Sequence, residues 1–437
     1  MSDPHRNAHT LWPDPDDYAL IDEAYDRSRE ILKFNACDTG FLAARGGGAN
    51  YNAVWGRDGA ICAAAAFVSD DEELIDIGVR TLLSLAEHQA ANGQIPSYIE
   101  IGKGDQVTQV VHGGWGNVTA IDANLWFVIA CQTAYDEIGR KEFIAENLLD
   151  VYRRAMRHLD SIDADTCGLL EIPVGGDWSD LLTRSYHVLY DQALWFRALL
   201  CESRLMSLAG DETEAETLKQ RASLVQQRLN AEFWWDTDGI ARAAKRYLIA
   251  SPLPHGRELP YYQSYLEPFE QFWYQRFDAF GNILACLVGI APPHRVEQII
   301  QQVRQRQMAR PHPIRVLDPP VQAGDEDWIG IYHAKQKPYE YHNGAAWPLA
   351  GGLWAVLLTG TQRHDEAARA MVDLARSLRL SADGEDNWEF HEYFHGKTGA
   401  PMGRAYQAWS AASYLLGYKA VHDERFACFQ SPSRYAG

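Results

Sequence analysis

Cysteine pairs, long apolar runs and positive charge are all scarce in this sequence. Its 437 residues include seven cysteines, an odd number, and no two of them form a C-x-x-C pair. Such scattered cysteines predict reduced thiols in the cytoplasm rather than a disulfide framework or a cysteine-ligated zinc site. No apolar run approaches the roughly 20 residues of a membrane helix, and residues 1–12 contain no signal-peptide core. We therefore expect a soluble, cytoplasmic protein without a membrane partner.

Basic residues are outnumbered, since 40 Lys and Arg stand against 59 Asp and Glu and give a formal charge of −19. A surface of that sign repels phosphates and argues against nucleic acid as a partner. The chain also has no Walker loop, no G-x-S-x-G elbow and no dinucleotide-binding glycine fingerprint. It does have 14 Trp and 21 Tyr, whose rings stack on the apolar faces of sugars. A small carbohydrate is therefore the expected ligand class.

Apolar residues recur with helical spacing along most of the chain. Val296, Ile299 and Val303, for example, share one helix face. The same test predicts about twelve helices, near residues 16–34, 59–69, 72–90, 118–138, 141–160, 189–209, 212–232, 278–289, 293–309, 343–359, 363–379 and 402–419.

The connections between these helices are of two kinds. Some are short turns, whereas others are long and rich in aromatic and charged residues: 91–117, 161–188, 233–277, 310–342 and 380–401. Long loops inside a compact domain usually carry function. The pattern predicts an all-α fold in which helical hairpins form a ring and the long loops gather at one rim. No linker-like stretch divides residues 1–437, so we expect a single catalytic domain, with residues 1–15 as a poorly ordered extension.

Two of the long loops place carboxylates among aromatic residues. The first contains Asp177 and Asp180 on either side of Trp178. Glycoside hydrolysis needs one carboxylic acid to protonate the leaving oxygen and one carboxylate to activate water or attack carbon. The same segment also fits an Asp-rich turn that caps the following helix, and the sequence alone leaves both interpretations open.

The second such loop contains Glu392. In an extended segment, alternate residues share a face, so Glu392 would lie in a stripe with Trp388, Phe390 and Phe394. A carboxylate in an aromatic stripe is costly to ionise, and burial raises its pKa. The alternative is an ion pair between Glu392 and an arginine such as Arg404.

Histidines in the same loop form an H-E-x-x-H string at residues 391–395. A zinc protease needs this string on a helix so that both histidines share a face, whereas the surrounding aromatics here favour an extended chain. We therefore expect no metal site.

Two further segments carry side chains that bind hydroxyl groups. Trp55, Arg57 and Asp58 offer a ring, a fork of donors and an acceptor within four residues, although an Arg–Asp pair is also a common structural ion pair. His342 and Asn343 precede a predicted helix, with Asn343 as its expected N-cap. His342 is either catalytic or a satisfied structural histidine.

Taken in order, these segments resemble the inverting (α/α)6-barrel glycoside hydrolases, especially the neutral/alkaline invertases and the amylo-α-1,6-glucosidase domains of glycogen-debranching enzymes. The resemblance runs from about residue 50 to 419 and includes N-G-Q-I-P at 92–96, I-D-A-N-L-W at 121–126, H-N-G-A-A-W-P at 342–348 and Q-A-W-S at 407–410. It implies an (α/α)6 barrel and an exo-acting, inverting enzyme that needs neither metal nor organic cofactor.

The resemblance also implies roles for individual residues. Asp180, in its W-x-D setting, becomes the general acid, with Asp177 in reserve, and Glu392 becomes the general base that holds the attacking water. In an inverting enzyme the two carboxyl groups are expected roughly 6.5–9.5 Å apart. The residues expected to line the sugar-binding subsite are Trp55, Arg57, Asp58, Asp122, Asp177, Trp178, Gln192, His342, Asn343 and Trp347.

The sequence departs from this family in one informative stretch. Residues 186–191 read Y-H-V-L-Y-D, where the invertases carry a G-H-P-L-E-I pattern, and this departure puts sucrose in doubt as the substrate. We expect a short α-glucoside, such as a disaccharide or a glycosylated osmolyte, with sucrose first among named sugars. The alternatives are a sugar epimerase or isomerase that uses its histidines as bases, and a carbohydrate-binding protein without turnover. The oligomeric state stays open, a homo-oligomer included.

Overall fold

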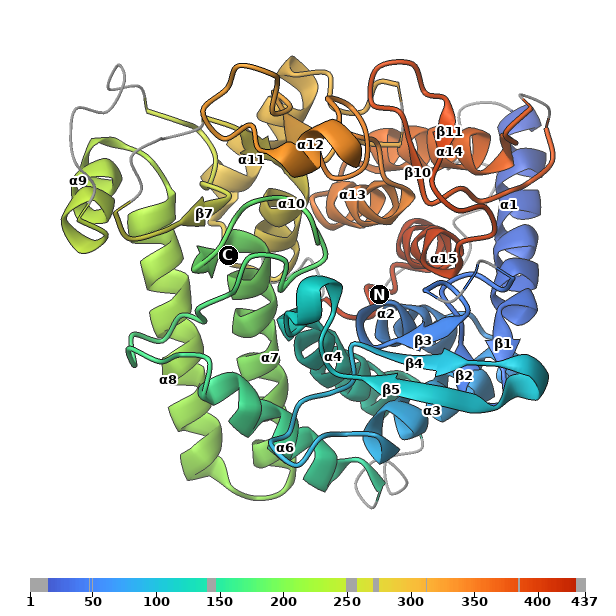
Figure 1. The fold of residues 1–437 in the computed structure, drawn as a ribbon, viewed down its shortest axis with the longest axis horizontal. Helices are drawn as coiled ribbons and strands as arrows, with labels where there is room; N and C mark the ends of the chain where they lie inside the picture. Colours follow the sequence, from blue (N-terminus) through green and yellow to red (C-terminus); the bar gives the residue numbers. More distant parts are fainter. Residues whose placement is uncertain are drawn as a thin grey trace.

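The structure is a computed structural model that describes residues 15–46, 48, 50–139, 147–248, 258–269, 275–311, 313–383 and 386–429. In these residues the helices form two concentric rings (Figure 1). The inner ring consists of helices that each pack against the next, with the last against the first: α2 (Gly56–Phe67), α4 (Ile121–Glu137), α7 (Leu189–Leu208), α10 (Ala279–Leu287), α13 (Pro348–Gly360) and α15 (Ala408–Asp423).

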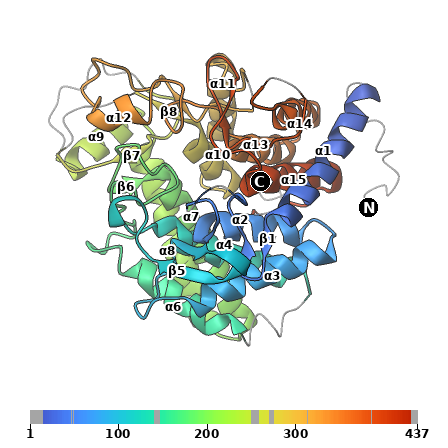
Figure 2. The ribbon, with the colours of Figure 1, turned by 45° about the vertical axis from the view of Figure 1, so that its right-hand side comes forward.

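The outer ring contributes one helix to each inner helix. Its members are α1 (Pro15–Phe34) on α15, α3 (Glu72–Glu87) on α2, α6 (Leu149–Asp160) on α4, α8 (Glu212–Arg228) on α7, α11 (Pro293–Gln305) on α10 and α14 (His364–Arg379) on α13. Figures 1 and 2 both place α1 at the periphery beside α15. The described helices therefore form the predicted (α/α)6 barrel.

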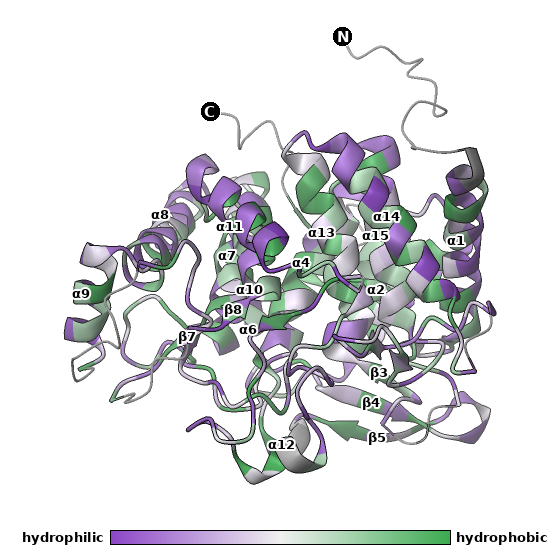
Figure 3. Cartoon of the chain, turned by 90° about the horizontal axis from the view of Figure 1, so that it is seen from above, coloured by the Kyte–Doolittle hydropathy of each residue, from purple (hydrophilic) through white to green (hydrophobic). Residues whose placement is uncertain are grey.

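The two rings differ in how their residues are buried. Every residue of α2 and α13 is buried, as expected for helices that are enclosed on all sides. In contrast, α8 buries a single stripe of Ala215, Leu218, Ala222 and Val225, and Figure 3 shows it as largely hydrophilic. Small residues bring inner helices close together: a side chain at Gly352 of α13 would collide with the backbone of α15.

Loop length alternates along the chain. Four connections from an inner helix to the next outer helix are short: α2 to α3, α7 to α8, α10 to α11 and α13 to α14. Those from an outer helix to the next inner helix are long. The long loops consequently emerge where the inner helices begin, which confirms their predicted gathering at one rim. Figure 3 shows β3, β4, β5 and α12 (Gly330–Ala334) on the same side of the barrel.

Short antiparallel strands order these loops, a detail that the all-α prediction lacked. One three-stranded sheet joins β3 (Ala53–Trp55), β4 (Tyr98–Ile101) and β5 (Val107–Val111). The remaining strands form two-residue pairs: β1 (Ala36–Cys37) with β2 (Gly40–Phe41), β6 (His187–Val188) with β7 (Tyr265–Leu266), β8 (Phe277–Asp278) with β9 (Leu317–Asp318), and β10 (Tyr393–Phe394) with β11 (Pro401–Met402).

Each predicted helical range contains a helix, but some boundaries were wrong. The helix predicted from 343 begins at Pro348, so Asn343 is not its N-cap, and the one predicted from 402 begins at Ala408. The long loop 233–277 contains the unpredicted helix α9 (Thr237–Arg246). The predicted N-terminal extension lies outside the described residues apart from Pro15, where α1 begins.

Two expectations concern thiols and membranes. All seven cysteines are buried and free, which confirms the prediction of packed, unpaired thiols. Across the described helices, none is both long and apolar enough to cross a bilayer.

Candidate active site

A pocket of about 60 Å³ lies at the end of the barrel where the inner helices begin. Asp180 enters it from the loop before α7, and Glu392 from the loop before α15. The first turns of α2 and α15 supply further wall residues. The lining consists of Ala43, Asn50, Tyr51, Trp55, Arg57, Asp58, Trp178, Asp180, Tyr341, Glu392, Gln407 and Trp409.

Arg57, at the start of α2, connects the carboxylates at the floor of this pocket. Its Nη1 lies 3.0 Å from Asp122 Oδ2, its Nε 3.4 Å from Asp58 Oδ2, and its Nη2 4.0 Å from Asp180 Oδ1. Asp122 also accepts the hydroxyl hydrogen of Tyr190 at 3.2 Å. Burial raises the pKa of Asp122 to about 6, although Arg57 opposes the shift. A single guanidinium therefore faces three carboxyl groups, two of them in the first turns of inner helices.

Asp180 occupies a tight turn at the pocket wall, with its side chain 14% exposed. Its Oδ2 accepts a hydrogen bond from the hydroxyl of Tyr341 at 3.1 Å. Burial raises the pKa of Asp180 to about 7; Arg57 opposes this rise and Asp122 adds to it. The turn depends on Gly175, which has a φ of +78° and whose added Cβ would lie 2.9 Å from the Asp180 carbonyl oxygen.

Glu392 is held from one side, with Oε2 accepting from the Tyr51 hydroxyl at 3.0 Å and from the Arg404 backbone N–H at 3.1 Å. Burial raises the pKa of Glu392 to about 7, against the effect of these two donors. The guanidinium of Arg404 donates to the Gly46 carbonyl instead, so the alternative of a Glu392–Arg404 ion pair is wrong. Gly403, with a φ of +69°, lies so close that an added Cβ would be 2.5 Å from Glu392 Oε2.

Aromatic rings fix the wall behind Asp180. Trp178 packs edge-on against Phe280, His342 and Trp347, with centroid distances of 4.7, 4.7 and 5.4 Å. His342 stacks on Trp347 at 4.8 Å, and Trp347 meets Trp409 edge-on at 5.6 Å. Such interlocked rings give the pocket a rigid surface that suits the apolar faces of a sugar.

Near the opening, Trp55 packs on Tyr98 at 4.7 Å and donates its indole N–H to the Asn50 carbonyl at 2.6 Å. At the floor, Asp58 also lines the pocket, and burial raises its pKa. Rings, carboxyl groups and a guanidinium around one small pocket form a site that can bind hydroxyl groups and protonate an oxygen.

Comparison with known proteins points to the same chemistry. The model of the alkaline and neutral invertase family matches residues 266–424. Probable alkaline/neutral invertase D of Arabidopsis thaliana is 24% identical over 93% of this chain and 83% of its own length. Cytosolic invertase 1 of Oryza sativa subsp. japonica is 23% identical over 95% and 80%. The chain is a glycoside hydrolase related to these invertases.

Solved structures show the same barrel. A GH63 mannosylglycerate hydrolase from Thermus thermophilus, in complex with glucose, superposes with a TM-score of 0.63 at 16% identity and covers 92% of this chain and 99% of its own. A bacterial glucoamylase complexed with acarbose gives 0.63 at 14% identity, over 95% and 58%. At these identities the two structures support the (α/α)6 fold alone.

The structure brings six of the expected site residues of this hydrolase into the pocket lining and places three others directly behind it. Those in the lining are Trp55, Arg57, Asp58, Trp178, Asp180 and Glu392. Those behind it are Asp122, His342 and Trp347, each in contact with a lining residue.

The other three expected residues form hydrogen bonds and ion pairs with other groups of the protein instead. Asp177 accepts from Ser179 and forms a buried ion pair with Arg184 at 2.7 Å, so its carboxylate is fully engaged. Gln192 exchanges both its amide hydrogen bonds with the backbone of Leu170. Asn343 bonds the backbone of residues 321 and 336. These contacts do not support sugar binding by the three.

Six lining residues were missing from the sequence-based set: Ala43, Asn50, Tyr51, Tyr341, Gln407 and Trp409. Tyr341, Gln407 and Trp409 adjoin or lie within segments that carry the family resemblance, and Asn50 and Tyr51 lie where it begins, so position in those segments was the signal available. Ala43 lies outside them. Tyrosine hydroxyls that contact both carboxyl groups could not be inferred from spacing, because Tyr51 and Glu392 are 341 positions apart.

The histidines of the H-E-x-x-H string do not converge. His391 Nε2 lies 2.8 Å from Glu389 Oε2, and His395 Nδ1 accepts from backbone N–H groups of residues 397 and 398. In the described part of the chain, one group has metal-ligand spacing, Asp163 with Asp165 and Cys167, and its carboxylates already accept backbone N–H groups of their own turn.

Proposed function

We propose that this glycoside hydrolase removes a terminal sugar from a short α-glycoside with inversion at the anomeric carbon, and that residues 1–437 act as one catalytic domain. The observation that carries the proposal is the pair Asp180 and Glu392, two carboxyl groups with raised pKa in one small aromatic pocket. Glycoside hydrolysis uses two carboxyl groups, one on each side of the bond that is cleaved.

In this proposal Asp180 is the general acid. Burial keeps a proton on its carboxyl group up to about pH 7, so it can protonate the leaving oxygen near neutrality. Arg57 and the Tyr341 hydroxyl hold the carboxyl group in place and stabilise the carboxylate that forms when the proton leaves.

Glu392 is the general base. Both of its donors, the Tyr51 hydroxyl and the Arg404 N–H, bond Oε2 and favour the ionised form. Oε1 is therefore the atom proposed to accept a proton from the attacking water. The water adds to the anomeric carbon as the bond to the leaving oxygen breaks; Asp180 supplies one proton and Glu392 takes one.

The pocket suits one terminal sugar unit rather than a chain interior. The buried ion pair of Arg57 with Asp122 closes its floor, so a sugar chain cannot pass through it. The substrate is proposed to be a disaccharide or a glycosylated small osmolyte, with sucrose first because the relatives are named invertases. The free thiols fit the proposed cytoplasmic location.

The contacts of the histidines argue against the epimerase alternative. Both ring nitrogens of His342 are buried, and burial lowers its pKa, so the ring is neutral; it also stands behind the lining of the pocket rather than in it. A binding protein without turnover is disfavoured because both carboxyl groups are in the pocket.

The test is a proton NMR time course with sucrose, isomaltose, a short malto-oligosaccharide and glucosylglycerate. We expect one of them to release a sugar that appears first as the anomer opposite to the bond cleaved. Release of the retained anomer would contradict the roles of Asp180 and Glu392. Interconversion of free sugars without hydrolysis would favour the epimerase.

A further inference from the structure

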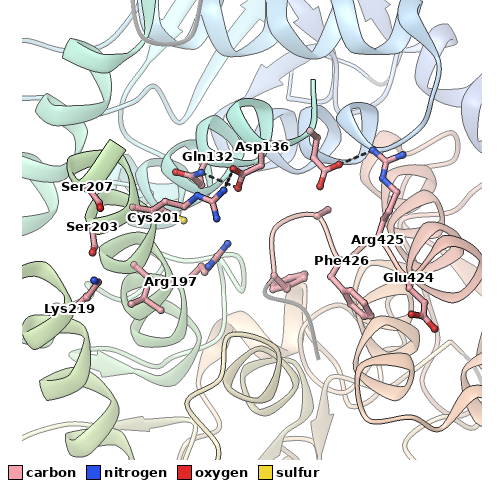
Figure 4. A pocket seen from close by; sticks show the side chains of 15 residues that line it. Gln132, Asp136, Arg197, Cys201, Ser203, Ser207, Lys219, Glu424, Arg425 and Phe426 are labelled. Atoms are coloured by element: carbon pink, nitrogen blue, oxygen red, sulfur yellow. Dashed lines mark hydrogen bonds and ion pairs between the residues drawn. The ribbon is translucent and has the colours of Figure 1, made fainter. Parts of the chain in front are cut away.

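A second pocket, of about 630 Å³, lies at the opposite end of the barrel, where the inner helices α4, α7 and α15 end (Figure 4). Its volume falls in the range of sites for small organic ligands, about 300–1,000 Å³. None of the residues that line the active-site pocket takes part in it. It is therefore a separate cavity with its own chemistry.

Arg197, in the middle of α7, is the most unusual residue of this pocket. Its side chain is only 8% exposed, and its Nε donates to the Cys428 carbonyl at 2.8 Å. Within the described chain no acceptor bonds its two terminal nitrogens, and Figure 4 shows them directed toward the open space. These nitrogens line the cavity, so an anionic or carbonyl partner that enters the cavity can reach them. The free edge of the guanidinium matches the paired oxygens of a phosphate or carboxylate.

The neighbouring acidic groups do not supply that partner. Asp136 is paired with Arg204 at 2.6 Å, and Glu137 with Arg425 at 2.8 Å. Lys219, on α8, lines the same side of the pocket as Arg197 and has no ion pair with a described residue. The α7–α8 side of the cavity therefore carries positive charge that its own acidic residues do not neutralise, although the whole chain has a charge of −19.

The opposite side of the cavity has a different character. There the segment after α15 contributes Phe426, with an apolar ring, and Glu424, with a carboxylate that can act as a hydrogen-bond acceptor (Figure 4). Aromatic faces and carboxylates are the groups that bind the two surfaces of a sugar, its C–H faces and its hydroxyls. A ligand that satisfies both sides has an anionic end and a hydroxylated body.

We propose that this pocket binds a phosphorylated sugar. The phosphate lies against Arg197 and Lys219, and the sugar ring extends toward Phe426 and Glu424. A phosphomonoester carries close to two negative charges at neutral pH, which matches the two unpaired cations. The site is independent of the hydrolytic pocket and of the substrate proposed for it.

Isothermal titration calorimetry on the whole chain tests this site, with glucose 6-phosphate, glucose and inorganic phosphate as separate probes. We expect glucose 6-phosphate to bind at least about tenfold more tightly than either of the others. Equal affinity for inorganic phosphate, equal affinity for glucose, or no binding of glucose 6-phosphate overturns the proposal.

Variants locate the binding. Arg197→Gln is expected to weaken it at least about tenfold, and Lys219→Gln, at an exposed position that folding does not need, about threefold. The matched control is Arg221→Gln, also on α8 but ion-paired with Asp160 outside the pocket, which leaves the affinity unchanged. Glu392→Gln alters the other pocket and also leaves it unchanged. Binding that survives both Arg197→Gln and Lys219→Gln, or that is lost in Glu392→Gln, assigns the ligand to the active site and refutes the second one.

Discussion

Replacing Tyr51 by phenylalanine removes one hydrogen bond from the proposed base and nothing else from its carboxylate. The Tyr51 hydroxyl donates to Glu392 Oε2 at 3.0 Å, while the Arg404 N–H bond to the same atom stays. A donor of this kind favours the ionised carboxylate, so its loss raises the pKa of Glu392.

The size of the effect follows from the strength of the bond. A hydrogen bond to a charged group contributes about 1.5–3 kcal/mol, and one pH unit of pKa corresponds to about 1.4 kcal/mol. The pKa of Glu392, about 7 in the parent protein, should therefore rise by about one to two pH units. At pH 7 the ionised fraction of the base falls about 5- to 50-fold, and kcat/KM falls with it.

The assay is kcat/KM against pH for the parent and two variants. The base must be ionised and the acid protonated, so the parent profile is a bell with its maximum near pH 7. Tyr51→Phe shifts the acidic limb of the profile to higher pH. Tyr341→Phe is the matched control, because it removes the equivalent donor from Asp180. Its loss raises the pKa of the acid and shifts the alkaline limb of the profile to higher pH instead.

The two limbs distinguish the roles of the two carboxyl groups. If Tyr51→Phe moves the alkaline limb and Tyr341→Phe the acidic one, Glu392 is the acid and Asp180 the base. If kcat/KM falls by the same factor at every pH and neither limb moves, the tyrosines act by contacting the sugar. The reasoning from hydrogen bonds to the carboxyl groups is then refuted.

Three further substitutions test the site and its support. Asp180→Asn should lower turnover about 10²–10⁴-fold with sugar binding intact. Burial raises the pKa of Asp180 from 3.8 to about 7, so ionising this group opposes folding as the pH rises through that range. The variant should therefore be more stable than the parent by about 4 kcal/mol at pH 8 and equally stable at pH 3.5, as denaturant titrations at the two pH values would show. Gly403→Ala places a methyl group against Glu392 Oε2 at a position with left-handed backbone. We expect kcat to fall more than tenfold while the circular dichroism spectrum stays unchanged. Full activity would contradict the tight packing at this position. Asp177→Asn leaves Arg184 a buried cation with one acidic partner fewer and should destabilise the fold by about 3–5 kcal/mol; an unchanged melting temperature would restore Asp177 as a candidate for the site.

The sequence predicted the helices well because apolar periodicity is a local property. It failed where a boundary depended on a single residue: Pro348 begins α13 because proline suits the first turn of a helix, and this leaves Asn343 five residues upstream of the helix, bonded to loop backbone. Helix α9 was not predicted because it buries only Gly239 and Ala243, so it lacks the apolar periodicity that marks the other helices.

The lining of the candidate pocket was predictable from the sequence in outline and not in detail. Carboxylates among aromatics pointed to Asp180 and Glu392, but spacing could not separate Asp180 from Asp177. That distinction depends on Arg184, which forms a buried ion pair with Asp177. Gln192 illustrates the same limit, because a residue in a matching segment can support the site through the backbone of Leu170 without touching the ligand.

The contact between α15 and α2 has a consequence for synthesis of the protein on the ribosome. Asp180 and Arg57 emerge early, but Glu392 and Trp409 belong to the last hairpin, and the wall of the pocket is complete only once that hairpin docks against α2. With the roles proposed for Asp180 and Glu392, a nascent chain therefore lacks hydrolytic activity until that hairpin docks. Activity therefore indicates that the whole inner ring of helices has formed. Chains truncated before the last hairpin should be inactive.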